Sequence, residues 1–209
     1  MMRGFVAMVV LGPALWVVLL VAGWVVAAPW GDAGRGRLIF EEKGCAGCHR
    51  PQTQEQGIGP ALDMIRRPQG LLQLSGRFWN HAPAMFAMFE LQGLKWPDLT
   101  VEQMVDLMAY LQGEPSRDPP GDLFQGRVVL VRKGCLKCHS LHGEGNSSAA
   151  DLSQLRDRYE SPIVWATTVW NHSPKMATLA NRLGVQYARF SGDEMGNLLE
   201  FLRSSSPPR

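Results

Sequence analysis

The sequence predicts an all-α protein in which two tandem, related helical domains follow one N-terminal transmembrane helix. Three observations lead to this prediction. The 209-residue chain opens with a long uncharged hydrophobic segment, and most of the remainder is an internal duplication. Apolar residues in each copy recur at the three- and four-residue spacing of helices. We find no convincing pattern of alternating apolar and polar residues, which would indicate strands.

The hydrophobic segment, residues 4–28, contains no charge and follows Arg3. It is long enough to cross a bilayer, which takes about 20 residues in a helix. Trp24 and Trp30 would suit the interface of the membrane. A signal peptide cleaved near Val26-Ala27-Ala28 is the alternative. With Arg3 in the cytoplasm, we expect a protein anchored in the lipid bilayer of the bacterial inner membrane, with its domains facing the periplasm.

The duplication aligns Gly36–Cys45 with Gly126–Cys135, and Trp79–Met85 with Trp170–Met176. Repeats of this kind indicate that each copy is one structural unit. The predicted parts are a first domain at residues 31–113, a proline-rich linker at 114–121, a second domain at 122–204 and a disordered tail at 205–209.

Each repeat is predicted to begin and end with a helix. The first helix of each repeat stops at Gly44 or Gly134, which suit the residue after a helix C-terminus. The last helix opens with a capping box, Thr100–Gln103 in the first repeat and Ser191–Glu194 in the second.

All four cysteines lie in two C-x-x-C-H motifs, at residues 45–49 and 135–139. This spacing is the attachment signature of c-type haem. Residues three apart share one face of a helical turn, so both sulfurs can reach the two vinyl groups of one porphyrin. A four-cysteine zinc site or redox dithiols would also use C-x-x-C pairs. Neither needs a histidine directly after the second cysteine, and both motifs have one.

On these motifs and the duplication, residues 34–204 resemble two class I c-type cytochrome domains, and the pair resembles the membrane-anchored dihaem cytochromes. The resemblance implies two covalently attached c-type haems, one in each repeat. The residues implied for attachment and for the proximal iron ligands are Cys45, Cys48 and His49, and Cys135, Cys138 and His139.

In this family the first and last helices cross near the haem edge. Gly36 and Phe40 match the residues of that crossing on the first helix, and Tyr110 matches their partner on the last. The second repeat keeps the glycine and an aromatic partner, as Gly126 and Phe201. It has Leu130 in place of Phe40.

The family commonly holds the proximal histidine through the carbonyl of a proline in a Gly-Pro-x-Leu segment. Gly59-Pro60-Ala61-Leu62 fits this pattern. Ala149-Ala150-Asp151-Leu152 of the second repeat departs from it. The departure puts the corresponding hydrogen bond of the second repeat in question.

The sixth iron ligands are expected to be Met85 and Met176. Each lies in a matched Pro-x-Met segment that resembles the distal ligand loop of class I cytochromes. The other matched methionines, Met104 and Met195, fall on the apolar face of a terminal helix, where packing explains them.

Two histidines compete with these methionines. His81 and His172 also match between the repeats, lie in the same segments and carry imidazoles that bind haem iron well. Trp79 and Trp170 are expected to pack against the porphyrins.

Two six-coordinate haems leave no open position for a substrate, so we expect an electron carrier without catalytic residues. It would relay electrons between a membrane respiratory or other electron-transport complex and a periplasmic partner, as a carrier or as a subunit of that complex. A dihaem peroxidase with one open haem site is the alternative, although both repeats hold the same ligand segment. The net charge of +2 does not suggest nucleic-acid binding.

Charge is unequal between the repeats, because acidic residues outnumber basic ones in residues 31–115 and the reverse holds in 116–209. The second repeat places basic side chains around its haem motifs. They predict either a solvated surface or a positive surface that attracts an acidic periplasmic redox partner. These side chains are Arg132, Lys133, Lys137 and Lys175.

Overall fold

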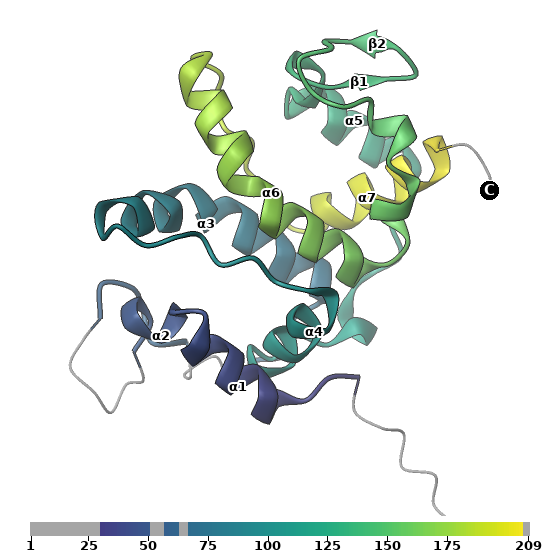
Figure 1. The fold of residues 1–209 in the computed structure, drawn as a ribbon. Coiled ribbons are helices and arrows are strands. Elements are labelled where there is room, and N and C mark those ends of the chain that lie inside the picture. Colours follow the sequence, from purple (N-terminus) through teal and green to yellow (C-terminus); the bar gives the residue numbers. More distant parts are fainter. Residues whose placement is uncertain (1–29, 51–56, 63–66, 207–209) are drawn as a thin grey trace, which may run out of the picture.

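The computed structural model describes residues 30–50, 57–62 and 67–206, and it is mostly helical (Figure 1). The predicted anchor at residues 4–28 lies outside the described residues. Within the described part, no helix has the length and apolar character needed to cross a membrane. The α-helices are α1 (Ala33–Glu42), α2 (Cys45–Cys48), α3 (Leu71–Leu91), α4 (Val101–Tyr110), α5 (Leu123–Arg132), α6 (Pro162–Arg182) and α7 (Glu194–Ser205).

Shorter elements occupy the second half and the linker. Two short strands form an antiparallel pair that the sequence did not predict. The remaining elements are β1 (Ser140–Leu141) and β2 (Glu144–Gly145), with the 3-10 helices η2 (Pro115–Arg117), η3 (Cys135–Lys137), η4 (Leu152–Gln154) and η5 (Arg156–Tyr159).

The predicted crossing of the first and last helices is confirmed in both halves. α1 packs against α4, and α5 packs against α7. A Cβ atom at Gly36 would overlap the carbonyl oxygen of Asp106, and one at Gly126 would overlap that of Asn197. Only glycine permits backbones to approach this closely.

Side chains fasten the crossing in the first half. The rings of Phe40 and Tyr110 lie 5.4 Å apart between centroids. Asp106, buried on α4, accepts hydrogen bonds from Arg35 Nε at 2.7 Å and from Arg35 Nη2 at 3.1 Å. The backbone N–H of Asp32 donates a third, at 2.8 Å.

The two predicted capping boxes differ. Thr100 and Gln103 form a complete box at the start of α4, with bonds of 3.2 and 3.1 Å. In the second half Glu194 accepts from the N–H of Ser191 at 2.8 Å, but α7 begins only at Glu194. The Glu194 carboxylate also pairs with Lys133 at 2.7 Å, so it ties α7 to the end of α5.

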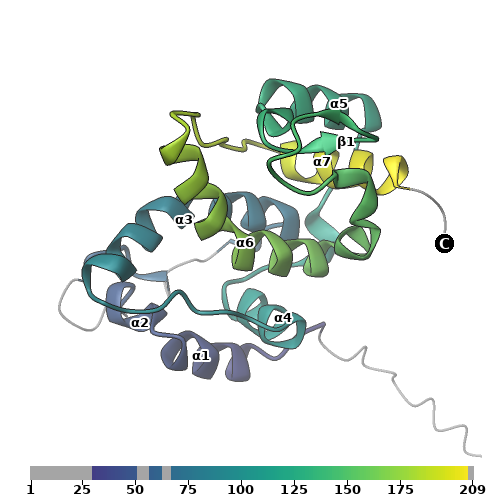
Figure 2. The ribbon, with the colours of Figure 1, turned by 45° about the horizontal axis from the view of Figure 1, so that its top comes forward.

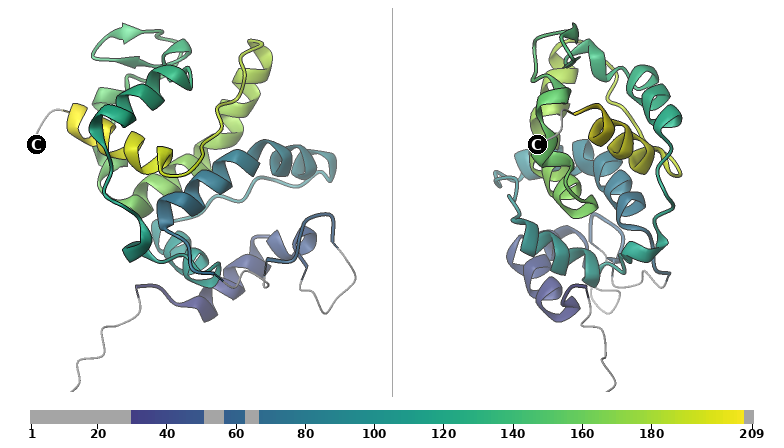
Figure 3. Two further views of the ribbon diagram at one scale, coloured as in Figure 1. Left: turned by 180° about the vertical axis from the view of Figure 1, so that it is seen from behind. Right: turned by 90° about the vertical axis from the view of Figure 1, so that its right-hand side faces the viewer.

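The middle helices, α3 and α6, lie side by side between the two ends of the molecule. Figure 1 shows α1 and α4 at one end, α5 and α7 at the other, and Figures 2 and 3 show α3 beside α6 from other directions. α3 also contacts α7 of the second half, and α6 contacts α4 of the first. Each middle helix therefore packs against the opposite half.

Matching hydrogen bonds in the two repeats hold each middle helix against the opposite half. Trp79 Nε1 donates to the carbonyl of Ala188 at 2.6 Å, and Trp170 Nε1 donates to that of Pro97 at 2.8 Å. The adjacent asparagine in each repeat both donates to and accepts from one backbone residue of the other half. Asn80 pairs with Phe190 at 2.6 and 2.8 Å, and Asn171 pairs with Leu99 at 2.9 and 3.0 Å.

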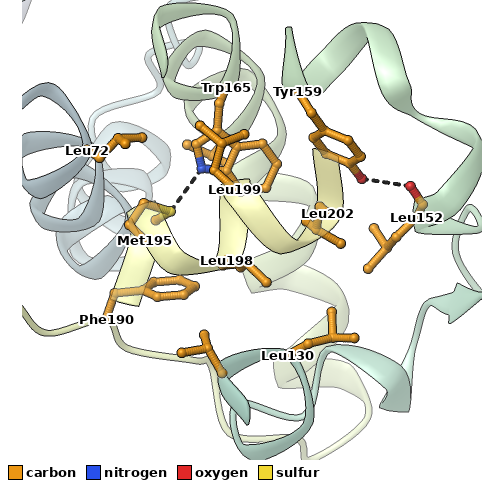
Figure 4. Close-up of a cluster of buried hydrophobic side chains, with 12 residues drawn as sticks. Leu72, Leu130, Leu152, Tyr159, Trp165, Phe190, Met195, Leu198, Leu199 and Leu202 are labelled. Atoms are coloured by element: carbon orange, nitrogen blue, oxygen red, sulfur yellow. Dashed lines mark hydrogen bonds between the residues drawn. The ribbon is translucent and has the colours of Figure 1, made fainter. Parts of the chain in front are cut away.

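Each of the two hydrophobic cores likewise includes residues from the middle helix of the opposite half. The core of the second half includes Leu72 of α3, as Figure 4 shows, and Trp79 packs against it. In that core Trp165 Nε1 donates to Met195 Sδ at 3.0 Å. The core of the first half includes Ala166 and Trp170 of α6. The predicted boundaries at 31–113 and 122–204 remain a prediction about the duplicated units, and the packing crosses them.

The linker is fastened to the start of α3. Asp118 accepts a hydrogen bond from the backbone N–H of Leu72 at 2.9 Å, within the first turn of the helix. A Cβ atom at Gly70 would overlap the carboxylate of Asp118. Gln69 exchanges backbone hydrogen bonds with Gln112 and Glu114. The linker thus caps a helix besides joining two halves.

The predicted loop around Pro83 and Pro174 is wrong. Both prolines lie inside helices of 21 residues, α3 and α6. A proline inside a helix leaves the carbonyl four residues earlier without its usual partner. For Pro174 that carbonyl belongs to Trp170, and the hydroxyl of Ser173 donates to it at 2.9 Å. Packing between the middle helices outweighs the local preference for a loop.

Candidate functional site

Both cysteine motifs sit directly after a helix that ends in a left-handed glycine. Gly44 has φ 80° and is followed by α2, while Gly134 has φ 72° and is followed by η3. Glycine adopts this conformation without strain. It turns the chain so that the two cysteines of each motif lie on one short helical turn. All four thiols are free of disulfide bonds.

The thiol environment does not favour the alternative chemistries. Burial raises the pKa of Cys45 and that of Cys135 to about 11. Redox dithiols need a lowered pKa, because the thiolate is the reactive form. Cys45 and Cys135, one from each pair, also pack against different cores. Among the described residues, which include every cysteine, no three His, Cys, Asp or Glu side chains gather as a metal cluster.

The two predicted proximal histidines are held in the same way. His49 Nδ1 lies 2.9 Å from the carbonyl oxygen of Pro60, and His139 Nδ1 lies 2.8 Å from that of Ala150. With the proton on Nδ1, each ring donates to its carbonyl and leaves Nε2 free to bind a metal. The bond that the sequence put in question for the second repeat is therefore present, because any residue supplies a carbonyl.

Asp151 fixes the segment that lacks the proline. Its carboxylate accepts from Gly143 N at 2.7 Å, from Ser153 N at 2.8 Å and from Ser140 Oγ at 3.0 Å. Hydrogen bonds from Ser153 and Gly143 hold the pKa of Asp151 well below its usual range. The carboxylate thus takes over the ordering of the neighbouring Ala150 carbonyl that proline provides in the first repeat.

A cavity opens beside the first motif, with an empty volume of about 1050 Å³ that includes space open to solvent. Cys45, Cys48 and His49 line one side of it. The remaining walls are mostly apolar and include Phe40, Leu62, Phe78 and Trp170. Two thiols, a free imidazole nitrogen and apolar walls are the groups that a covalently attached haem requires.

Both candidates for the sixth ligand in the first half lie on α3. His81 and Met85 are one turn apart, and both line the cavity. The rings of His49 and His81 have their centroids 6.2 Å apart. Met85 packs against the core of the first half.

In the second half, His172 and Met176 occupy the matching places on α6. Burial and the nearby His139 lower the pKa of His172. Burial and the nearby His49 likewise lower the pKa of His81. His81 thus lies near His49, and His172 lies near His139. The choice between histidine and methionine stays a prediction here.

The sequence missed one part of the first site. Trp170 was expected to pack against the haem of its own repeat, yet it lines the cavity of the other one. Its ring lies against that of Trp96 of the first half in a tilted arrangement, with ring centroids 4.4 Å apart. Nothing in the sequence tells which half receives this indole, because Trp79 and Trp170 stand in matching contexts.

This site has the groups of a c-type haem attachment site in a small helical domain. Residues 33–114 match the family model described as Cytochrome c. This span is therefore a cytochrome c domain, whose family implies a covalently bound c-type haem and haem-based electron transfer. Searches of curated proteins and of solved structures found no match to the chain.

Proposed function

We propose that the chain is a dihaem c-type cytochrome that relays electrons between a membrane electron-transport complex and a periplasmic partner. One observation carries the second haem. His139 repeats the arrangement of His49, with a free thiol pair before it and a carbonyl on Nδ1 at 2.8 Å. The matched family model ends at residue 114, so this repeated geometry is what supports a second attachment site.

A bound haem supplies a one-electron Fe(III)/Fe(II) couple. The residues of the chain hold and tune that couple. Cys45, Cys48 and His49 would hold one haem, and Cys135, Cys138 and His139 would hold the other, with the cysteines attaching each haem and the histidine binding its iron. The carbonyls of Pro60 and Ala150 orient the imidazoles and raise their basicity. Apolar walls make the surroundings of the first site less polar and so would contribute to its potential.

The exchanged helices give the two sites a short connection. Trp170 lines the first cavity, and His172, two residues later on α6, lies near His139 of the second site. A single turn of helix therefore reaches both sites. We propose that electrons pass between the haems across α3 and α6.

The surroundings suggest an order for the relay. The segment predicted to cross the inner membrane ends only a few residues before α1 in the sequence, so the first half would face the membrane and the second would project into the periplasm. Lys137, Lys175 and Arg132 are exposed beside the second site. Lys133 pairs with Glu194 and so contributes little to this positive surface. Such a surface would steer an acidic partner to the second haem.

Intact-mass measurement of the purified chain tests the proposal. The wild type should carry the mass of two haems. The Cys45→Ala/Cys48→Ala and Cys135→Ala/Cys138→Ala variants should each carry one. A wild-type chain with a single haem, held only by the first motif, would limit the protein to a monohaem carrier and overturn the proposed relay.

A further inference from the structure

We propose that His81 and His172 are the sixth iron ligands, and that Met85 and Met176 are not. This inference rests on the proposed function, since it concerns the coordination of the same two haems. It reverses the choice that the sequence favours, and the arrangement of the two middle helices is the reason.

The distance between the rings of His49 and His81 supports histidine ligation at the first site. A ligating imidazole nitrogen lies about 2 Å from the metal, and the ring centre lies about 1 Å beyond it. Two imidazoles on opposite sides of one iron therefore have centres about 6 Å apart. The centroids of His49 and His81 lie 6.2 Å apart, and both residues line the cavity that the cysteines also line.

His81 and Met85 lie on the same helix. Methionine ligation was expected because the segment resembles a ligand loop of class I cytochromes, and here the segment is helical throughout. Met85 lies four residues beyond His81, which displaces it about 6 Å along the axis of α3. A rigid helix cannot bring both side chains to the same point above His49. Met85 is instead accounted for by its packing against the core of the first half.

Each of these two histidines directly follows residues that are hydrogen-bonded to the other half. Trp79 and Asn80, the two residues before His81, are hydrogen-bonded to Ala188 and Phe190 of the other half. Three fixed bonds next to the ligand determine the position of its backbone. Ligands of metal sites need such support to keep their geometry.

The second half repeats this support. Trp170 and Asn171 are bonded to Pro97 and Leu99, directly before His172. The distal ligand of each haem is therefore positioned by the loop of the other repeat. The same reciprocal contacts explain why the tryptophan, asparagine and histidine occur together twice in the sequence.

The test is spectroscopy of the purified holoprotein. We expect the oxidised wild type to lack the near-infrared charge-transfer band of methionine-ligated ferric haem and to show the paramagnetic resonance of low-spin bis-histidine haem. A methionine band for either haem would overturn the assignment for that site. This measurement on the wild type decides the question even if a variant fails to fold.

Matched variants identify the residues. His81→Ala should convert one haem of the two to a high-spin form, and His172→Ala the other. Met85→Ala and Met176→Ala, one turn away on the same helices, should leave both haems low-spin. High-spin haem in the methionine variants with unchanged histidine variants would contradict the inference. Intact mass distinguishes the histidine-ligation proposal from the dihaem proposal. Two haems with methionine ligation would contradict the histidine ligation and leave the dihaem function standing.

Discussion

Trp170 of the second repeat donates its indole N–H to the carbonyl oxygen of Pro97 in the first repeat, at 2.8 Å. Trp79 makes the reverse contact with Ala188, at 2.6 Å. Because each repeat completes the core of the other, the two halves form one cooperative unit.

Asn171→Ala should destabilise both halves together. The change removes two hydrogen bonds to Leu99, of 2.9 and 3.0 Å, and should lower the free energy of unfolding by about 1–3 kcal/mol. Denaturant unfolding, followed through the absorption of both haems, should show one transition at a lower midpoint. The control is Asn181→Ala, an exposed residue at the end of α6. Two separate transitions would contradict the cooperative unit.

Asp151→Ala should raise the potential of the second haem. The carboxylate accepts hydrogen bonds from Gly143, Ser153 and Ser140, and losing them frees the segment that holds the Ala150 carbonyl. A weaker bond to His139 makes its imidazole less basic and stabilises the ferric state less. Redox titration should show one haem shifted upwards and the other unchanged. Equal shifts of both haems would show that Asp151 acts through overall stability.

The extent of sequence-based prediction varies along the chain. The duplicated C-x-x-C-H motifs, the crossing glycines and the Thr100–Gln103 capping box were predictable because each depends on residues close in sequence. The packing of α3 and α6, each against the opposite half, was not predictable. Trp79 and Trp170 have the same neighbours, so their contacts fit either half equally well in the sequence.

Local propensity also favours structure that tertiary packing overrides. Pro83 and Pro174 favour a loop, yet burial of α3 against α6 keeps both segments helical. Likewise, the departure from Gly-Pro-x-Leu in the second repeat suggested a lost bond, but the carbonyl of Ala150 is kept in place by Asp151. Both differences arise from contacts between segments, which single-sequence patterns do not contain.

Asp106→Asn should lower the free energy of unfolding of the chain at neutral pH, and this effect should be lost at acidic pH. The hydrogen bond from Arg35 lowers the pKa of Asp106, so the carboxylate contributes stability above its unfolded pKa, about 3.8. That contribution is lost as the pH falls through the lower folded pKa. Since Arg35 is largely exposed, we expect a loss of about 1–2 kcal/mol at neutral pH.

Unfolding at neutral pH and at decreasing pH measures this effect. The difference between wild type and Asp106→Asn should shrink as the pH falls below the unfolded pKa. The exposed Asp98→Asn change serves as the control. A difference that stays constant with pH would show that the Asp106 charge contributes nothing.

Lys137→Glu with Lys175→Glu should slow electron exchange with an acidic soluble partner. Both lysines are exposed beside the second site, and reversing their charge removes the attraction that speeds association at low salt. The rate should fall and its salt dependence should weaken. Lys95→Glu, an exposed lysine of the first half, is the matched control. Unchanged rates with both haems intact would rule out docking at the second haem.

A spectroelectrochemical titration of the purified chain tests whether the two repeats, each packed against the other, hold two haems for electron transfer. We expect each chain to take up two electrons in two one-electron steps, each with the visible spectrum of low-spin c-type haem. Uptake of one electron per chain, or a spectrum without a second haem, would contradict it.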